Sequence, residues 1–350
     1  MKKLLEDLIE FKTVSDNNEF IKLFNYVKDY LKDSDLYFKE YIDEGKTSLV
    51  ISNTESKDLD VIFCGHVDVV PAKESQFKAK IEGNRMYGRG TYDMKGHDAV
   101  MIKLMKNLNT DYKVALFLTS DEEAGGFNGT DILLNKEGYT SKFAIVPDGG
   151  NNFNLIEEEK GVLELEISYT GKPAHGSTPY KGINAIVKLM DIYNKIIEIY
   201  PIPKDDNDFI TGVNLGSING GDYINRVAAF AKMGLDIRYI PSDTPESIIE
   251  NIKKIDEKMD IKIHEQSYEF KYIESDLSKK YLDVCNKVLG NKVTFAKCAS
   301  SSDARFFYKN GISTIIMNAS GHDMHGDDEW IDLDSLDKLY EIYSTFINNK

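Results

Sequence analysis

The stretch VALFLTSDEEAGG (114–126) is an apolar run that ends in three consecutive acids, Asp121, Glu122 and Glu123. Its first five residues have the length and composition of a buried β-strand. Neighbouring carboxylates repel one another, and burying even one without a partner is costly. Taken alone, the stretch is compatible with a strand that ends in a solvated acidic loop. The rest of the sequence favours a site that uses these acids.

Three further apolar runs have the character of buried strands: VIFC (61–64), FAIV (143–146) and STIIM (313–317). They are separated by stretches with helical periodicity, one of which is expected to begin near Lys95. Short apolar runs that alternate with helices are typical of an α/β sheet that is largely parallel.

From about Gly161 the pattern changes. VLELEISYT (162–170) alternates apolar and polar residues, as a half-buried strand does, and GINAIVKLMDIYNKIIEIY (182–200) has the period of a long helix. The STIIM strand then resumes the first pattern, and a length of 350 residues suggests two domains. We therefore expect a two-domain α/β protein. Its catalytic domain comprises residues 1–161 and 271–350, and an inserted α+β domain comprises residues 162–270.

Composition excludes several classes of protein. A formal net charge of −15 argues against a nucleic-acid partner, which needs a basic surface. No apolar run approaches the roughly 18 residues of a membrane span. The three scattered cysteines fit reduced thiols in the cytoplasm. The first eleven residues, MKKLLEDLIEF, predict a surface helix rather than a secretory signal. We expect a cytoplasmic protein that binds neither nucleic acid nor membranes.

A histidine or a carboxylate follows each predicted strand of the larger domain. These residues are His66 and Asp68 after 61–64, Asp93 in YGRGTYDMKG (87–96), Glu122 and Glu123 after 114–118, Asp148 after 143–146, and His322 and His325 after 313–317. In open α/β sheets, ligand sites lie beyond the carboxyl ends of the strands. The side chains are therefore expected to meet at one edge of the sheet.

Histidine and carboxylate ligands without cysteine suit zinc, cobalt or manganese. Two imidazoles and three carboxylates can hold two ions if one carboxylate bridges them, and such centres polarise carbonyls and generate hydroxide near neutral pH. Of the adjacent pair Glu122 and Glu123, one can bind an ion while the other takes a proton from water. Asp68 lies two residues after His66 on an extended segment and can orient that imidazole.

Motifs of several other enzyme classes are absent from the sequence, which has no GxSxG, no GxxxxGK[ST] and no HExxH. Arginine is also rare, since only five of the 43 basic residues are Arg. In a chain that uses lysine for most of its positive charge, an arginine suggests a position where the planar guanidinium binds a carboxylate or phosphate.

Together these motifs resemble the co-catalytic zinc metallopeptidases and deacylases. That family includes aminoacylase, acetylornithine deacetylase, succinyl-diaminopimelate desuccinylase, carboxypeptidase G and related di- and tripeptidases. The matching stretches, in the family's order between residues 65 and 329, are GHVDVVP, YGRGTYDMKG, TSDEEAGG, VPDGG, GKPAHGSTPYKGINAI, INRV, SSDARFF and HGDDE. The resemblance implies a zinc-exopeptidase-like, mostly parallel sheet flanked by helices, with the inserted domain acting as a lid or dimerisation domain.

The resemblance also implies two divalent ions per chain, zinc before cobalt or manganese, and a role for each matching residue. By this resemblance, His66 and Asp148 bind one ion, Glu123 and His325 bind the other, and Asp93 bridges the two. Glu122 is then the general base, and Asp68 orients His66. The resemblance gives His175 of the AHGS motif as an oxyanion donor that reaches the partner's site in a homodimer. It gives Asn225, Arg238 and Arg305 as substrate-binding residues.

We therefore expect a two-metal hydrolase that cleaves an N-acyl amino acid or a small peptide with a free carboxylate. Alternatives left open are a dipeptidase or aminopeptidase, a non-catalytic metal- or peptide-binding homologue, and a two-metal phosphohydrolase. His97 stands where the family usually has a small residue, and a helix cap or a surface position is expected for it ahead of a place in the cleft. In HDMH (322–325), His325 rather than His322 is the expected ligand. Arg226 receives no role.

Overall fold

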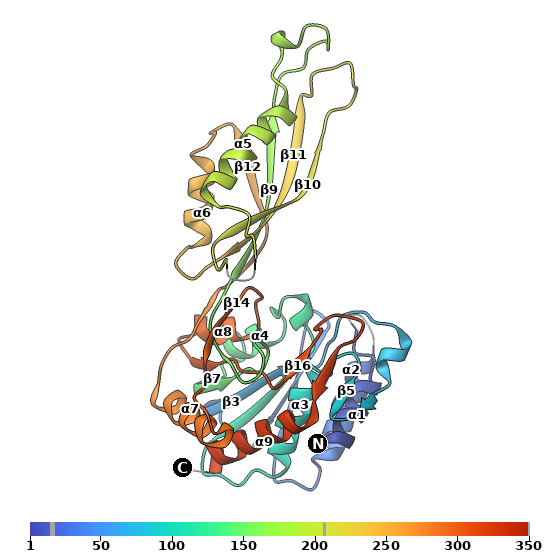
Figure 1. Cartoon of the computed structure of the whole chain (residues 1–350), viewed down its shortest axis with the longest axis vertical. Coiled ribbons are helices and arrows are strands. Elements are labelled where there is room, and N and C mark those ends of the chain that lie inside the picture. The colour runs from blue at the N-terminus through green and yellow to red at the C-terminus, as the bar shows by residue number, and fades with distance from the viewer. Residues whose placement is uncertain (15–17, 206–207, 349–350) are drawn as a thin grey trace. The chain divides into compact units, whose positions relative to one another are not determined.

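The computed structural model describes residues 1–14, 18–205 and 208–348 (Figure 1). The chain divides into two compact units. Unit 1 comprises Met1–Glu157, Tyr272–Ala296 and Ser302–Lys350, and unit 2 comprises Glu158–Lys271 and Lys297–Ser301. None of the described helices is long and apolar enough to cross a membrane.

Unit 1 is built on a mixed six-stranded sheet in the order β1–β2–β6–β3–β7–β15. The strands are β1 (Tyr37–Asp43), β2 (Lys46–Ser52), β3 (Asp58–His66), β6 (Val114–Thr119), β7 (Thr140–Ile145) and β15 (Ser313–Ile315). Strands β6, β3, β7 and β15 are parallel, and the β1–β2 hairpin pairs antiparallel along β6. All six residues of β6 are buried, which explains its continuous apolar sequence. The expected fold class, a largely parallel α/β sheet with a separate antiparallel domain, is confirmed.

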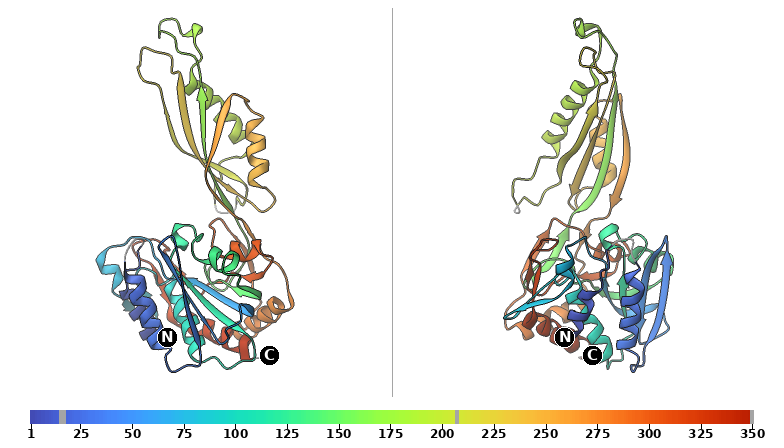
Figure 2. Two further views of the ribbon diagram at one scale, coloured as in Figure 1. Left: turned by 180° about the vertical axis from the view of Figure 1, so that it is seen from behind. Right: turned by 90° about the vertical axis from the view of Figure 1, so that its right-hand side faces the viewer.

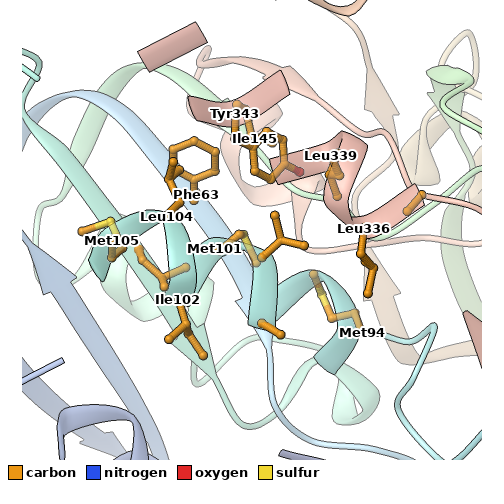
Figure 3. Packing of buried hydrophobic residues seen from close by; sticks show 14 of the residues in the cluster. Phe63, Met94, Met101, Ile102, Leu104, Met105, Ile145, Leu336, Leu339 and Tyr343 are labelled. Atoms are coloured by element: carbon orange, nitrogen blue, oxygen red, sulfur yellow. The ribbon is translucent and has the colours of Figure 1, made fainter. Parts of the chain in front are cut away.

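Helices cover both faces of this sheet. One hydrophobic core joins the strands to α1 (Lys2–Glu10), α2 (Glu19–Tyr30), α3 (Lys95–Lys106), α7 (Asp276–Leu289) and α9 (Leu333–Asn348). Figure 3 shows Met101 and Leu104 of α3 in this core with Phe63 of β3 and Tyr343 of α9, whose rings are 5.0 Å apart. Two short helices, α4 (Thr130–Asn135) and α8 (Ala304–Lys309), belong to the other face, where Phe307 packs on Phe117 of β6.

A small antiparallel sheet in unit 1 joins segments that are far apart in the sequence. Its order is β16 (Gly321–His322), β17 (Trp330–Asp332), β5 (Arg85–Tyr87) and β4 (Lys80–Glu82). The Arg85 guanidinium lies 3.9 Å from the centre of the Trp330 ring. The pairing of β5 with β17 brings the segment that carries Asp93 beside the segment that carries His325. A further three-stranded sheet contains β13 (Phe270–Lys271), β8 (Leu155–Glu159) and β14 (Phe295–Cys298).

Unit 2 is an antiparallel sheet in the order β10–β11–β9–β12, with two helices on one face (Figure 2). Its elements are β9 (Gly161–Thr170), α5 (Ala185–Ile199), β10 (Gly212–Gly220), β11 (Phe230–Tyr239), α6 (Pro245–Lys253) and β12 (Met259–Ser267). Leu163, Leu165 and Ile167 of β9 alternate with polar residues and share one core with both helices. The side chain of Asn184 caps α5 by accepting hydrogen bonds from the backbone N–H groups of Ile186 and Val187.

Candidate metal centre

The carboxyl ends of the parallel strands deliver the predicted side chains to one region of unit 1. His66 is the last residue of β3, and Glu122 and Glu123 open a 3₁₀ turn (Glu122–Ala124) after β6. Asp148 follows β7 by three residues, and His325 lies in the loop between β16 and β17. The structure brings these residues together as two groups of three potential ligands.

The first group is formed by His66, Glu122 and Asp148, with one ligand atom of each within 4.8 Å of the others. The Nε2 atom of His66 lies 3.9 Å from Oδ2 of Asp148. The Nδ1 atom of His66 lies 3.0 Å from the backbone oxygen of Asp68, whose carboxylate accepts a hydrogen bond from the backbone N–H of Glu123. Asp68 therefore fixes both the imidazole and the start of the acidic turn.

The second group is formed by Asp93, Glu123 and His325. Asp93 lies between the two histidines, with Oδ1 3.0 Å from Nε2 of His66 and Oδ2 2.8 Å from Nε2 of His325. The same nitrogen of His325 lies 3.2 Å from Oε1 of Glu123. Each oxygen of the Asp93 carboxylate thus faces one group, which is the arrangement that a bridging ligand requires.

The charge of this region fits two divalent cations. Burial and the charge of Asp93 raise the pKa of Asp148 to about 7, and burial and the charge of Asp148 raise the pKa of Glu122 well above its usual value. Hydrogen bonds to Asp93 and Glu123 raise the pKa of His325 to about 10. So many buried carboxylates favour any added positive charge, and nitrogen and oxygen donors without cysteine suit zinc, cobalt or manganese.

A buried ion pair, Arg89 with Glu329, holds the backbone of two members of the second group, Asp93 and His325. Glu329 is 1% exposed and accepts hydrogen bonds from the backbone N–H groups of Tyr92 and Asp93 through Oε1. Its Oε2 atom accepts from the backbone N–H of Gly90 and, at 2.6 Å, from the guanidinium of Arg89. Arg89 also donates to the backbone oxygen of His325 at 2.9 Å. His325 has a positive φ of 63°, so this bond supports an uncommon backbone conformation.

Sequence patterns did not predict Arg89 and Glu329. The available signals were the rarity of arginine and the position of Glu329 at the end of HGDDE, a motif that was interpreted for its histidine alone.

Glu122 lies beside a second buried arginine. Oε1 of Glu122 is 3.8 Å from Nη1 of Arg305. Arg305 is 3% exposed and donates to the backbone oxygens of Ser302 and Gly125, both at 2.8 Å. The guanidinium is therefore fixed next to Glu122.

The remaining residues that the sequence singled out in unit 1 lie outside both groups. Asp121 is buried and accepts a hydrogen bond from the backbone N–H of Asn128, so it stabilises the acidic loop. The surface or capping position expected for His97 is wrong, since the side chain is fully buried in α3 and Nε2 accepts from the backbone N–H of Ala319. His322 is exposed on β16.

Unit 2 separates its predicted functional residues into two places. His175 and Asn225 line the same pocket, where the backbone N–H of Gly176 donates to the backbone oxygen of Asn225. Arg226 forms an ion pair with Asp222. Arg238 lies near the other end of β11, eight residues beyond Phe230, which is on the order of 25 Å along a strand. One copy of unit 2 therefore does not bring Arg238 together with His175 and Asn225.

Comparison with known proteins agrees with this geometry. The chain is 30% identical to a LysW-lysine/LysW-ornithine hydrolase of Sulfurisphaera tokodaii, over 99% of this chain and 94% of the relative. It is 28% identical to a succinyl-diaminopimelate desuccinylase of Rickettsia massiliae, over 98% of each chain. The solved structure of a Staphylococcus aureus tripeptidase has the same fold, with a TM-score of 0.78 and 21% identity over 99% of this chain and 97% of that chain.

Residues 62–349 match the model of peptidase family M20/M25/M40. The match covers most of the chain and every residue of the two ligand groups. The chain therefore belongs to the M20/M25/M40 peptidase family, and it is a metal-dependent hydrolase of amide or peptide bonds.

Proposed function

We propose that this enzyme removes the acyl group from an N-acyl amino acid, or cleaves a short peptide, with a water molecule activated at a two-ion centre. The observation that carries the proposal is the position of Asp93 between His66 and His325, with Glu122 beside Asp148. The names of the two curated relatives, a desuccinylase and a LysW-lysine/LysW-ornithine hydrolase, favour a deacylase.

In this proposal His66 and Asp148 would hold one ion, Glu123 and His325 would hold the other, and Asp93 would be a ligand of both. When bound, two divalent ions polarise the substrate carbonyl and lower the pKa of water. Zinc is the preferred ion for this donor set, and cobalt and manganese are the alternatives.

Glu122 is proposed as the general base. A carboxylate oxygen of Glu122 accepts a proton from the attacking water and then delivers it to the leaving nitrogen, which yields a free amine and a free carboxylate. A base works best when its pKa is near the working pH, and burial shifts Glu122 in that direction. The Arg305 guanidinium, held by two backbone carbonyls, keeps the Glu122 side chain oriented.

We further propose that the enzyme is a homodimer joined through unit 2. Strand β10 is an edge of its sheet, and Ile218 on it is 41% exposed. The α5 side chains Val187 and Met190 are 51% and 53% exposed. An unpaired strand edge with exposed apolar residues is a template for pairing with another chain. The separation of Arg238 from His175 and Asn225 supports a site in which the partner's His175 donates to the oxyanion.

Amine release from a panel of N-acetyl and N-succinyl amino acids, dipeptides and tripeptides tests the proposed reaction. We expect hydrolysis of one group of compounds, complete loss of rate with a chelator, and recovery with zinc, cobalt or manganese. Phosphate esters serve as the negative control. Phosphate release would favour a phosphohydrolase, and no turnover with two ions bound per chain would favour a binding protein.

The substitution Glu122→Gln separates the base from the ligands. We expect kcat to fall at least about 100-fold, because general-base catalysis typically contributes 10²–10⁴ in rate. The ion content measured by elemental analysis should remain at two per chain. The matched variant Glu123→Gln should lose ions as well as activity. Near-normal turnover by Glu122→Gln would contradict the assignment.

The substitution Glu329→Gln tests the support of the ion centre. A Gln side chain keeps the shape but offers one fewer acceptor to the loop N–H groups and no charge to Arg89. Ion affinity, measured by competition with a chelator, should fall about 10–100-fold, as is typical when outer-shell partners of ligands are removed. Glu82→Gln, on exposed β4 of the same small sheet, should leave the affinity unchanged. Equal affinities of the two variants would refute the role of Glu329.

The double substitution Met190→Lys and Ile218→Lys tests the proposed dimer. It places charge on α5 and β10, so sedimentation velocity should report a monomer. Turnover should fall about 10²–10³-fold if the partner supplies the oxyanion donor. Ile263→Lys, at an exposed site on the opposite edge strand β12, is the control and should remain dimeric. A monomer with full turnover would contradict the role of His175 across the interface.

A further inference from the structure

A pocket of about 730 Å³ lies entirely within unit 2. Its lining combines apolar side chains, among them Ile202, Phe209 and Val213, with charged ones. The basic residues are Lys160, Lys204, Arg238 and Lys297, and the acidic residues are Asp205, Asp208 and Asp236. A volume in this range accommodates a small organic molecule, and apolar walls with a few polar groups are typical of ligand sites.

Lys160 is the unusual residue of this pocket. Its side chain is 4% exposed, and it forms no ion pair or hydrogen bond within the described part of the chain. Its ammonium lies 5.4 Å from the centre of the Phe209 ring. Burial lowers the pKa of Lys160, and the charge of Asp208 opposes that shift. Lysines are rarely buried without a paired acid, so this ammonium is available to an anion that enters the pocket.

Two other cations of the pocket, Lys297 and Arg238, have acidic partners. The Nζ atom of Lys297 lies 4.9 Å from the centre of the Phe209 ring and 2.7 Å from a carboxylate oxygen of Glu158. The Nε atom of Arg238 lies 2.9 Å from a carboxylate oxygen of Asp236. Of these three cations, Lys160 is the one without an ion pair among the described residues, and the fourth cation of the lining, Lys204, is exposed. The acids Asp205, Asp208 and Asp236 in the lining favour a singly charged ligand over a dianion, which they would repel more strongly.

We propose that this pocket binds an aliphatic carboxylate, with Lys160 as the cation that anchors the carboxylate group. The apolar residues Ile202, Phe209 and Val213 take the hydrocarbon part of the ligand. The inference goes beyond the proposed reaction, because it uses no residue of the ion centre. The carboxylate can belong to the enzyme's own substrate or to a separate small molecule.

Calorimetric titration of the metal-loaded enzyme with sodium hexanoate tests the proposal at constant ionic strength. We expect saturable binding that Lys160→Met weakens at least tenfold and Lys160→Arg largely restores. Lys253→Met, at an exposed lysine of α6, is the matched control and should bind as the parent enzyme does. 1-Hexanol should bind more weakly than hexanoate, because it lacks the charge.

Stability and inhibition measurements complete the test. Lys160 has no acid partner in the part of the chain that the structure describes, so Lys160→Met should keep the Tm and ion content of the parent enzyme. Competitive inhibition by hexanoate would show that the pocket binds the carboxylate of the substrate. Binding without competition would show that the pocket binds a separate small molecule. Equal hexanoate affinity in Lys160→Met and the parent, or equal affinity for hexanol and hexanoate, would overturn the proposal whatever reaction the enzyme catalyses.

Discussion

The buried pair of Arg89 and Glu329 is the interaction on which the rest of the centre depends. Its two side chains hold the backbone next to Asp93 and the backbone of His325, although these segments are more than 200 residues apart in the sequence. A bridging carboxylate is useful only if both of its oxygens face a ligand group at fixed spacing. The pair supplies that spacing from charged groups inside the protein, where breaking such a pair is strongly destabilising.

The fold gathers carboxylates at one sheet edge, and this arrangement couples metal binding to stability. Parallel strands end together, so every strand that contributes a ligand also contributes negative charge to the same buried region. Burial raises the pKa of Glu122 and Asp148, because the charged forms are disfavoured there. Bound cations relieve this cost, so ion binding to the folded state stabilises it.

The sequence predicted the parts of the fold that have strong periodic signals. Continuous apolar runs identified the parallel strands, and the helix expected near Lys95 begins there. The hairpin Tyr37–Ser52 and strand β10 (Gly212–Gly220) were not predicted, because their exposed edges carry polar residues and glycine that obscure alternation. His97 was assigned to the wrong environment because burial of a neutral imidazole depends on one distant backbone donor, Ala319. To predict the separation of Arg238 from Asn225, the register of β11 in its sheet must be known, and a comparison of motifs does not contain that register.

The five arginines of this chain lie in different environments, since Arg89 and Arg305 are buried whereas Arg226 is partly exposed. Their partners are the Trp330 ring for Arg85, Glu329 for Arg89, Asp222 for Arg226, Asp236 for Arg238, and two backbone carbonyls for Arg305. Lysine, with 38 copies, supplies nearly all other positive charge. At Arg89 and Arg305, a planar group with several N–H donors bonds two or more acceptors at once, which a lysine ammonium on a flexible stem does less well. In related lysine-rich proteins, an arginine kept beside the ligand motifs would therefore point to a buried structural contact before any coordinates exist.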